Sequence, residues 1–446
     1  MLSEIKQFKT NNPDVEEVDL LLLDIPGKFY GKRYAIEAIE KIADAGLKFP
    51  KGMPLMSVIG EAVDALGHGL EDGDPDAEIE LIPGTLQRVS WESEPRAQVM
   101  VRYVSGNANS PCWEPRSCLM GVLDRFKTDG LFPVVAYELE FYLVDKKRTK
   151  HGLVQPAIGP RSGQRDNFAV LGMDRVSDFG ECLSDIKRTC LEQGICIGPI
   201  SAEVGMGQYE INLPHSKDVL NAADQCAMFK RIVRGVALNH GFNASFMAKP
   251  YLAHAGNGLH LHTSLYDSDG NNVFHDESTD KGSGKLINAI GGLLKMMPAS
   301  LAFLAPNTNA FRRLKPNNNV PVSPNWGYEN RSVAVRVPDS DANNQRIEYR
   351  LGGADANPYL ALAVMLAGIH YGIQQKLVAG EPIENLSTDA FGLPTDLLAA
   401  LRVTEASDVL KDYLGDEFIP IYCAQKRSEV AAFEAAISVR EYEWYL

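Results

Sequence analysis

The hydrophobic positions of the chain follow two periods. Short alternating or continuous apolar runs predict strands, whereas apolar positions spaced three and four apart predict helices. We expect strands at 18–23, 78–82, 98–103, 132–144 and 259–266. We expect helices at 35–46, 117–128, 177–193, 217–239, 284–304, 357–376 and 427–443, the second of them capped by Ser117. These elements lack the regular strand–helix repeat of a Rossmann fold, and the sequence contains neither G-x-G-x-x-G nor a P-loop lysine motif.

The length and one break in the pattern indicate more than one domain. The chain has 446 residues, which is long for a single domain. Gly, Asn, Ser and Pro cluster at 105–115. We therefore predict a smaller N-terminal domain at 1–110 and a larger domain at 111–446. The polar stretch 68–76 is expected to be a loop of the first domain.

Composition and charge exclude several classes of protein. The formal net charge is -14, so the surface repels phosphate backbones and anionic lipids, and neither nucleic acid nor a membrane is an expected partner. No apolar run is expected to span a bilayer, and the first residues lack a signal-peptide pattern. The seven cysteines are scattered and form no CxxC pair, which fits a reducing compartment. We expect a cytoplasmic protein.

Two glutamates interrupt an apolar strand. Glu138 and Glu140 lie two apart in V-V-A-Y-E-L-E-F-Y-L-V, so both side chains point to the same face. Adjacent carboxylates repel each other and lose hydration when they are buried. One interpretation is that this face is the solvated side of an antiparallel sheet. The other is that a divalent cation offsets the two charges.

Further acids and two histidines occur in glycine-rich, strand-like segments. Glu203 and Glu210 flank the run V-G-M-G-Q-Y, and His260 and His262 share one face of the strand after G-N-G. A single histidine in such a strand is more often a core residue than a ligand, but a pair strengthens the cation interpretation. Carboxylates with one or two imidazoles favour Mg²⁺ or Mn²⁺ over zinc or copper.

Arginines in the last third of the chain supply the opposite charge. Arg336 and Arg350 each interrupt a strand-like apolar segment, and Arg313 and Arg331 lie in neighbouring polar segments. These arginines could form surface ion pairs of small value. They could instead clamp phosphate and carboxylate groups, to which the guanidinium fork is suited. Acidic residues that could bind metal ions, together with arginines that could bind anions, are the residue types that a phosphoryl-transfer site requires.

Taken in order, these segments resemble the glutamine synthetase family from about Val18 to the C-terminus. The likeness is greatest to the γ-glutamylputrescine and γ-glutamylpolyamine synthetase branch. It lies in L-F-P-V-V-A-Y-E-L-E-F-Y-L at 131–143, F-M-A-K-P at 246–250, H-A-G at 254–256 and E-Y-R-L-G-G-A-D-A-N-P-Y at 348–359. The resemblance implies an α+β fold, with an N-terminal β-grasp domain and a catalytic domain whose antiparallel half-barrel sheet is surrounded by helices. It also implies a homo-oligomer of stacked rings, often a dodecamer, with active sites between subunits.

The resemblance also implies a role for each candidate residue. Mg²⁺ or Mn²⁺ would be held at two metal sites, one formed by Glu140, Glu203 and Glu210 and the other by Glu138, His260 and Glu348. Substrate would be bound by Gly256, Arg313, Arg350 and Asn319, with Arg313 on the glutamate α-carboxylate. His262, Ser264, Arg331 and Arg336 would face ATP, and the catalytic arginines would be Arg313, Arg331, Arg336 and Arg350. The implied reaction joins the γ-carboxyl of glutamate to an amine through γ-glutamyl phosphate.

The choice of amine depends on a departure from the ammonia-using members. Their flap carries an acid that aligns here with Asn319, and no clear acid stands at the N-terminal partner position, where Ser57 falls. Loss of both anions weakens the attraction for a small cation. This departure argues against ammonia, and the overall likeness to the polyamine branch favours putrescine or another polyamine. The alternatives are a glutamine synthetase using ammonia, a ligase for a monoamine or ethanolamine, and a non-catalytic structural or regulatory protein.

Overall fold

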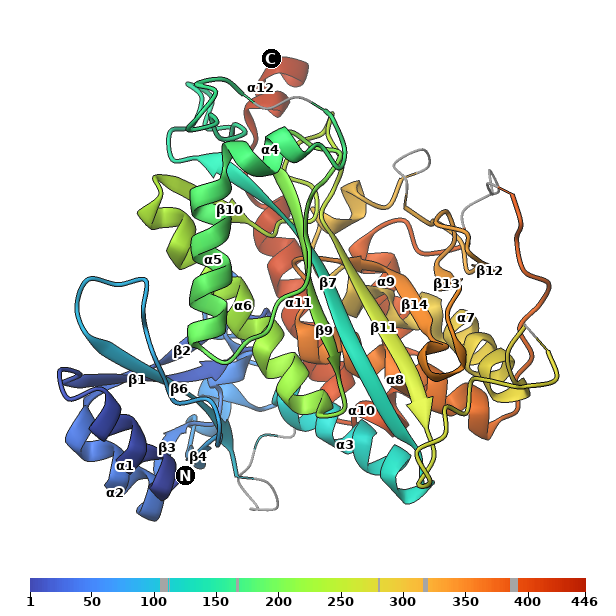
Figure 1. The fold of residues 1–446 in the computed structure, drawn as a ribbon, viewed down its shortest axis with the longest axis horizontal. Coiled ribbons are helices and arrows are strands. Elements are labelled where there is room, and N and C mark those ends of the chain that lie inside the picture. Colours follow the sequence, from blue (N-terminus) through green and yellow to red (C-terminus); the bar gives the residue numbers. More distant parts are fainter. Residues whose placement is uncertain (105–110, 112, 166–167, 280, 316–319, 386–391) are drawn as a thin grey trace.

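The computed structural model describes the chain except for residues 105–110, 112, 166–167, 280, 316–319 and 386–391. The described part is a mixed α+β structure built on two sheets (Figure 1). The smaller sheet lies within residues 17–103 and the larger within residues 132–353. This arrangement confirms the predicted fold class.

The N-terminal sheet has two parallel strands at its centre. Its order is β2-β1-β6-β4-β3, in which β1 (Glu17–Leu23) runs parallel to β6 (Arg96–Tyr103). Its other strands are β2 (Phe29–Ala35), β3 (Leu47–Pro50), β4 (Asp76–Leu81) and β5 (Gln87–Arg88), which pairs with β6. Helices α1 (Leu2–Asn11) and α2 (Ile39–Ala45) share a hydrophobic core with these strands. A mixed sheet covered by a helix is the expected β-grasp arrangement.

The larger sheet has the order β12-β13-β14-β11-β7-β9-β8, with β10 paired to β7. Its strands are β7 (Phe132–Asp145), β8 (Ile200–Ala202), β9 (Gln208–Ser216), β10 (Phe242–Ser245), β11 (Gly258–Tyr266), β12 (Trp326–Tyr328), β13 (Val335–Val337) and β14 (Ile347–Gly353). All its pairs are antiparallel except β12 with β13, and the sheet curls into a half-barrel (Figure 1). The long strands β7 and β11, both of which were predicted as strands, lie side by side at its centre.

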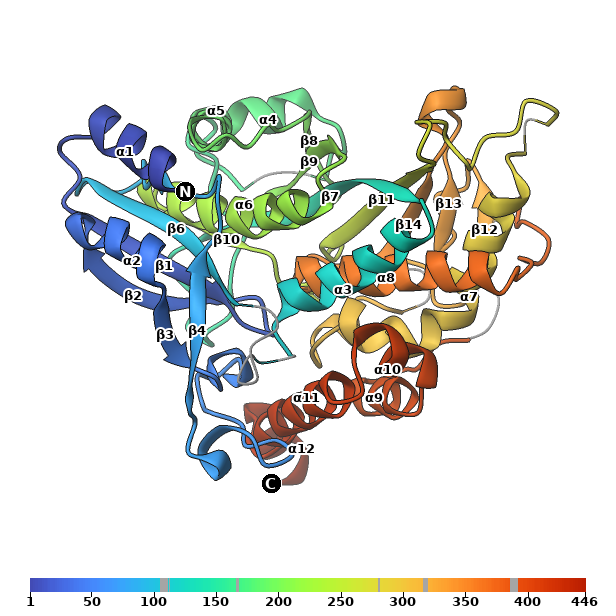
Figure 2. The ribbon, with the colours of Figure 1, turned by 90° about the horizontal axis from the view of Figure 1, so that it is seen from below.

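Helices cover the face of this sheet that is turned away from Glu138 and Glu140. Seen from below, α3 (Pro115–Thr128), α7 (Gly284–Leu304) and α8 (Pro358–Gln374) lie beside the sheet, with α9 (Leu397–Glu405), α10 (Asp408–Leu414) and α11 (Phe418–Glu434) in a further layer (Figure 2). The hydroxyl of Tyr137 on β7 donates to the carbonyl of Pro358 on α8 at 3.1 Å. Because successive residues of a strand alternate between faces, Glu138 and Glu140 point to the opposite side.

Several predicted helices differ from the observed ones. The stretch 177–193 is divided at Phe179 into α4 (Met173–Asp178) and α5 (Gly180–Glu192), and α6 follows at Val219–Asn239. The stretch 427–443 is likewise divided between α11 and α12 (Val439–Tyr445), because Ser438 opens a new helix with a capping box to Glu441. Ser117 does not cap α3, because Pro115 already occupies the first turn. The Ser117 hydroxyl instead donates to the Glu114 carboxylate at 2.5 Å.

The expectation that no segment could span a membrane needs a correction. Within the described ranges, α7 is long and apolar enough to cross a bilayer by length and composition. However, 72% of its apolar window is buried inside the structure. Its hydrophobicity is therefore that of a core helix, packed against α8 and α9.

Side chains on α8 and α11 bind backbone carbonyl groups of the N-terminal region. The Asn357 amide, which caps α8, donates to the carbonyl oxygens of Asp24 and Ile25 at 3.0 and 3.1 Å. The Gln425 amide of α11 donates to the Met56 carbonyl at 2.9 Å. These bonds fix the N-terminal sheet against the helices that support the larger sheet.

Candidate active site

Strand register collects the predicted acids and histidines on one face of the larger sheet. The opposed pairs are Glu140 with Glu210 across β7 and β9, Glu138 with His260 across β7 and β11, and His262 with Glu348 across β11 and β14. Residues two apart on a strand share a face, so these pairs form one row across four strands. The structure thus brings together the predicted metal ligands that lie on these strands.

Three carboxylates at one end of the row form a group. Glu140, Glu203 and Glu210 each offer an oxygen within 4.8 Å of the others. Burial, followed by repulsion from neighbouring carboxylates, raises the pKa of Glu203 to about 7 and that of Glu210 to about 9. Burial also raises the pKa of Glu140, although the Gly258 amide donates to it at 2.7 Å. The three side chains lack sufficient positive charge near them, and a divalent cation would supply it.

Glu138 takes part in two further groups. It lies with Glu210 and His260 in one, and with His262 and Glu348 in the other, again with ligand atoms within 4.8 Å. Its Oε2 is 3.2 Å from Nδ1 of His260, and its Oε1 is 2.9 Å from Nε2 of His262. Burial opposes its charge, but the two imidazoles outweigh burial and hold the pKa of Glu138 well below its usual range. The structure therefore adds His262, which was predicted to face ATP, to the predicted trio of Glu138, His260 and Glu348.

The donor set fits Mg²⁺ or Mn²⁺. Among the described residues, the groups that could hold a metal ion contain only glutamates and histidines. Oxygen donors predominate, and hard divalent ions prefer such donors. The solvated-face interpretation does not hold, because Glu348 is almost fully buried and the other acids are only partly exposed.

Two arginines balance the charge of Glu348. Arg336 donates from Nη1 to Glu348 Oε2 at 2.8 Å, and Arg350 contacts the other carboxylate oxygen. Burial opposes the charge of Glu348, but His260 and Arg350 lower its pKa to about 2. Arg336 also pairs with Glu329 at 3.1 Å. The Nε atoms of both arginines are buried and have no hydrogen-bond partner in the described chain.

Arg313 is buried beside the glycine turn that precedes β11. Its Nη1 donates to the Leu351 carbonyl at 2.9 Å. A Cβ added at Gly256 would lie 2.8 Å from Arg313 Cγ and 2.5 Å from the Ala248 oxygen, so only glycine fits at this position. The structure therefore places Gly256 against the Arg313 side chain.

The remaining predicted residues have different surroundings. Ser264 is buried on β11, two residues beyond His262 and on the same face. Arg331 is exposed in the turn between β12 and β13. Asn319 lies outside the described residues. Arg346, to which no role was assigned, donates from Nε to Nδ1 of His262 at 3.4 Å.

Gln208 is a buried residue that sequence reasoning missed. Its Nε2 lies 3.1 Å from Glu140 Oε2 and 3.0 Å from the Gly256 carbonyl, and its Oε1 accepts the Gly205 amide at 2.9 Å. One side chain thus connects a predicted metal ligand with two loops of the site. Its spacing of two residues from Glu210, which gives a shared strand face, was the available signal.

Arg175 of α4 is a second missed residue. Its guanidinium donates to the carbonyl oxygens of Ala169, Glu203 and Gly205, and only 3% of the residue is exposed. It therefore fixes the loop that carries Glu203. No sequence signal marked it, because backbone carbonyls leave no trace in residue types.

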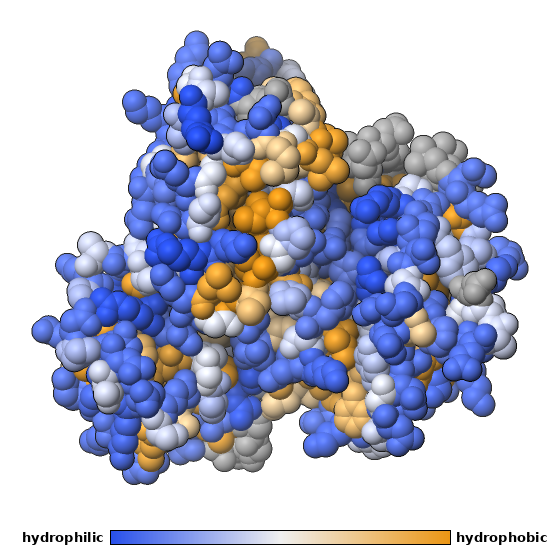
Figure 3. All heavy atoms as spheres, in the orientation of Figure 1, coloured by the Kyte–Doolittle hydropathy of each residue, from blue (hydrophilic) through white to orange (hydrophobic). Residues whose placement is uncertain are grey.

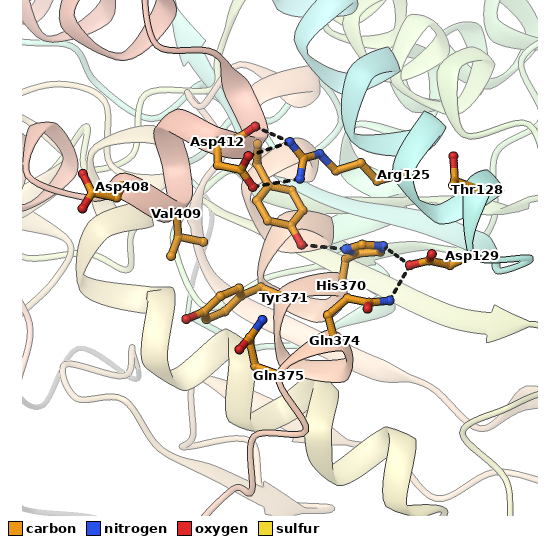
Figure 4. Close-up of a pocket in the computed structure, with 11 residues that line it drawn as sticks. Arg125, Thr128, Asp129, His370, Tyr371, Gln374, Gln375, Asp408, Val409 and Asp412 are labelled. Atoms are coloured by element: carbon orange, nitrogen blue, oxygen red, sulfur yellow. Dashed lines mark hydrogen bonds and ion pairs between the residues drawn. The ribbon is translucent and has the colours of Figure 1, made fainter.

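A separate cavity of about 550 Å³ lies among α3, α8 and α10 (Figure 4). His370 lies 2.6 Å from the Tyr413 hydroxyl and 2.8 Å from Asp129 Oδ2, while Arg125 pairs with Asp412 at 2.8 Å. None of the predicted site residues lines this cavity. Apart from the exposed Asp408, its charged groups pair with one another, so we interpret them as contacts that hold the three helices together.

Comparisons with known proteins agree with the geometry of the carboxylate row. Residues 113–445 match the family described as glutamine synthetase, catalytic domain. The gamma-glutamylputrescine synthetase PuuA of Escherichia coli (strain K12) is 38% identical over 99% of this chain and 94% of its own length. The glutamine synthetase of Pyrococcus horikoshii is 33% identical over 93% of this chain and 89% of its own length. The glutamate–isopropylamine ligase of a Pseudomonas species is 29% identical over 97% of this chain and 95% of its own length.

Solved structures show the same fold. GmaS without ligand has a TM-score of 0.82 and 25% identity, covering 98% of this chain and 97% of its own. The GmaS/ADP complex has a TM-score of 0.83 and 24% identity, covering 99% of both chains.

The chain belongs to the glutamine synthetase family, as the ordered motifs predicted. It is a ligase that forms C–N bonds, like its relatives. The family uses ATP and divalent metal ions, and the glutamate–histidine groups described above could hold such ions.

Proposed function

We propose that the protein joins the γ-carboxyl of glutamate to an aliphatic amine at the expense of ATP, with putrescine or another polyamine as the favoured class. The row of glutamates and histidines across β9, β7, β11 and β14 carries the proposal. The similarity to gamma-glutamylputrescine synthetase over nearly the whole chain supports the class of amine.

Residue roles follow from position in the row. Glu140, Glu203 and Glu210 would hold one divalent ion, and Glu138, His260 and Glu348 a second, with His262 beside it. Bound ions would supply charge neutralisation for the phosphates of ATP. The guanidinium groups of Arg336 and Arg350, which both contact Glu348, would bind the transferring phosphoryl group and the γ-carboxyl. Arg313, with Gly256, would bind the glutamate α-carboxylate, whereas Arg331, Ser264 and His262 would face the nucleotide and Asn319 the amine.

The chemistry has two steps. A γ-carboxylate oxygen of glutamate attacks the γ-phosphorus of ATP, ADP leaves, and γ-glutamyl phosphate forms. The uncharged amine then attacks the γ-carbonyl carbon, phosphate leaves, and the new amide loses a proton. Alkyl ammonium ions hold their protons near neutral pH, so a nearby carboxylate must accept one before the attack.

Three properties of the whole protein belong to the same proposal. Residues 1–110 would form one domain and residues 111–446 the other. The protein would act in the cytoplasm and assemble into stacked rings with active sites between subunits. Analytical ultracentrifugation of the full chain tests the assembly, and a monomer that retains full activity would contradict it.

The test of function is phosphate release with ATP, glutamate and Mg²⁺ across ammonia, methylamine, ethanolamine, putrescine and spermidine, with mass spectrometry of the amide. We expect kcat/KM for the best polyamine to exceed that for ammonia by on the order of tenfold, or about 1.4 kcal/mol. Ammonia as the best substrate would indicate a glutamine synthetase, and a monoamine or ethanolamine a different branch. The absence of glutamate-dependent release with any amine would favour the structural or regulatory alternative.

A further inference from the structure

An aromatic group extends the row of carboxylates on β7. Tyr142 follows Glu138 and Glu140 at the same two-residue spacing, so its side chain lies on the same face. Its ring centroid is 5.1 Å from that of Tyr251, and the Tyr251 centroid is 5.0 Å from that of His254. We call Tyr142, Tyr251, His254 and Phe168, whose centroid is 5.3 Å from that of His254, the aromatic group.

The aromatic group touches two loops of the proposed active site. The Tyr142 hydroxyl donates to the carbonyl of Ala255, the neighbour of Gly256, at 2.7 Å. A Cβ added at Gly205, two residues after Glu203, would lie 1.9 Å from the same hydroxyl oxygen. Tyr142 therefore packs between the loop proposed to contact glutamate and the loop that carries a proposed metal ligand.

Two polar atoms within the aromatic group have no partner in the described chain. They are the Tyr251 hydroxyl oxygen and Nδ1 of His254, and both are buried. Burial, followed by the charge of Lys249, lowers the pKa of His254, so its imidazole is neutral and Nδ1 can accept a hydrogen bond. Buried polar atoms are rarely left unpaired, and two on adjacent rings indicate a missing hydrogen-bond donor.

The outer end of the aromatic group reaches the surface. Phe168 is 54% exposed. Leu252, which lies between Tyr251 and His254 in the sequence, is 81% exposed. Figure 3 shows that apolar residues gather in a band on an otherwise hydrophilic face, running downward from the region of α4. The group thus offers apolar ring faces leading outward from the carboxylates, with two hydrogen-bond acceptors among them. Aromatic faces bind methylenes.

We propose that the aromatic group selects the amine. The methylenes of an aliphatic diamine lie against the rings of Phe168 and Tyr251. The remote amino group donates to the Tyr251 hydroxyl oxygen and to Nδ1 of His254, while the other amino group reaches the γ-glutamyl carbon. This inference rests on the proposed function, because it requires that an amine attack in the same site.

The experiment compares putrescine with hydroxylamine, a nucleophile too small to contact the aromatic group. The variants are Tyr251→Phe, His254→Ala and their combination, with Tyr34→Phe in the N-terminal sheet as the matched control. We expect kcat/KM for putrescine to fall on the order of tenfold or more in the double variant, through KM, because both acceptors are lost. Hydroxamate formation should fall far less, and the control should leave both reactions as in the wild type. The glutamate KM and the Mn²⁺-induced rise in Tm report whether each variant keeps an assembled site.

Each contrary outcome has a distinct meaning. An equal loss with putrescine and hydroxylamine would overturn the inference, because the residues would then support the loop and not the amine. Unchanged kinetics with putrescine would also overturn it, and would fit a water molecule on the two polar atoms. If the wild type forms hydroxamate but no glutamylputrescine, the ligase function stands and this inference fails. If the wild type forms neither product, the proposed function itself fails.

Discussion

Glu140 and Glu210 face each other across the ladder between β7 and β9, although both are carboxylates and both are only partly exposed. Like charges in directly opposed positions destabilise a sheet. Burial, followed by repulsion from Glu138 and Glu140, raises the pKa of Glu210 to about 9. Near neutral pH a proton on Glu210 relieves this repulsion, and a divalent cation bound between the carboxylates would replace that proton. Metal binding and folding should therefore be linked.

The first prediction concerns this pair. Glu210→Gln keeps the shape of the side chain but removes one anionic ligand of the Glu140, Glu203 and Glu210 group. We expect the rise in Tm that Mn²⁺ gives the wild type to shrink strongly, and metal-dependent phosphate release to be lost. Differential scanning fluorimetry with EDTA and with graded Mn²⁺ measures the first effect. Glu37→Gln, at an exposed position near α2, is the matched control. A wild-type response to Mn²⁺ in Glu210→Gln would contradict the assignment.

The second prediction uses two adjacent arginines. Arg313 is buried beside Gly256, whereas Arg312 is exposed and lies over the Phe433 ring. Arg313→Lys keeps the charge but loses the two-pronged donor that matches a carboxylate. It should raise the glutamate KM far more than the KM for ATP. Arg312→Lys should change neither value. Equal effects of Arg313→Lys on both substrates would rule out a specific role in glutamate binding.

Alternation in the sequence predicted part of this site, because a period of two holds in every strand. It placed Glu138 and Glu140 on one face, and the order of motifs identified the family. The partner across the ladder was not predictable in this way, since strand register depends on pairing between distant segments. The β11–β14 ladder even contains an irregularity between Leu259 and Leu261, which sets the position of His262 opposite Glu348.

Helix ends show a second limit. The periodicity of 177–193 fits one helix, and its interruption at Phe179 depends on the burial of that ring in the core. Ser117 is a good N-cap residue by type, but Pro115 fixes the backbone of the first turn two residues earlier. At Phe179, tertiary packing thus outweighed the local helical preference. At Ser117, a neighbouring residue, Pro115, outweighed the preference for an N-cap.

The third prediction concerns Glu114, a buried carboxyl between β6 and α3. It accepts the Tyr103 amide at 3.2 Å and the Ser117 hydroxyl. Burial raises its pKa from 4.5 to about 7. Because the folded state holds this proton more tightly than the unfolded chain, the contribution of Glu114 is complete below pH 4.5 and is lost as the pH rises toward 7.

Glu114→Gln removes this pH-dependent loss of stability, because the amide stays neutral at both pH values. Its oxygen can still accept the Tyr103 amide, while its NH2 group donates to the Ser117 hydroxyl oxygen. The free energy of unfolding of the variant, relative to the wild type, should therefore increase between pH 5 and pH 8. The increase is bounded at about 3 kcal/mol, since each pKa unit corresponds to about 1.4 kcal/mol. Urea unfolding at the two pH values measures the free energy of unfolding of each protein. Subtracting the wild-type value removes the contribution of the other titrating groups. An unchanged difference between variant and wild type would show that Glu114 is already ionised in the fold.

The last prediction concerns Gln208, which joins Glu140, Gly256 and the Gly205 amide through one side chain. Gln208→Leu has a similar size but removes these three contacts and a fourth, from Nε2 to Asn257 Oδ1 at 3.1 Å. Residues that orient a metal ligand typically change metal affinity by about 10–100-fold when they are replaced. We expect weaker Mn²⁺ binding by that factor and, because the Gly256 loop loses its anchor, a higher glutamate KM.

Gln193→Leu is the matched control for Gln208→Leu. Gln193 is also buried and makes two bonds of similar length, to Gln98 and to the Arg88 carbonyl, but it lies outside the site. Both variants should lower the Tm of the metal-free protein, because each leaves buried polar groups unpaired. Only Gln208→Leu should also change the Mn²⁺ titration and the glutamate KM together. If the two variants behave alike in all three measurements, Gln208 stabilises the fold without positioning the site. If the Mn²⁺ affinity alone changes, it orients Glu140 but does not hold the glycine loop.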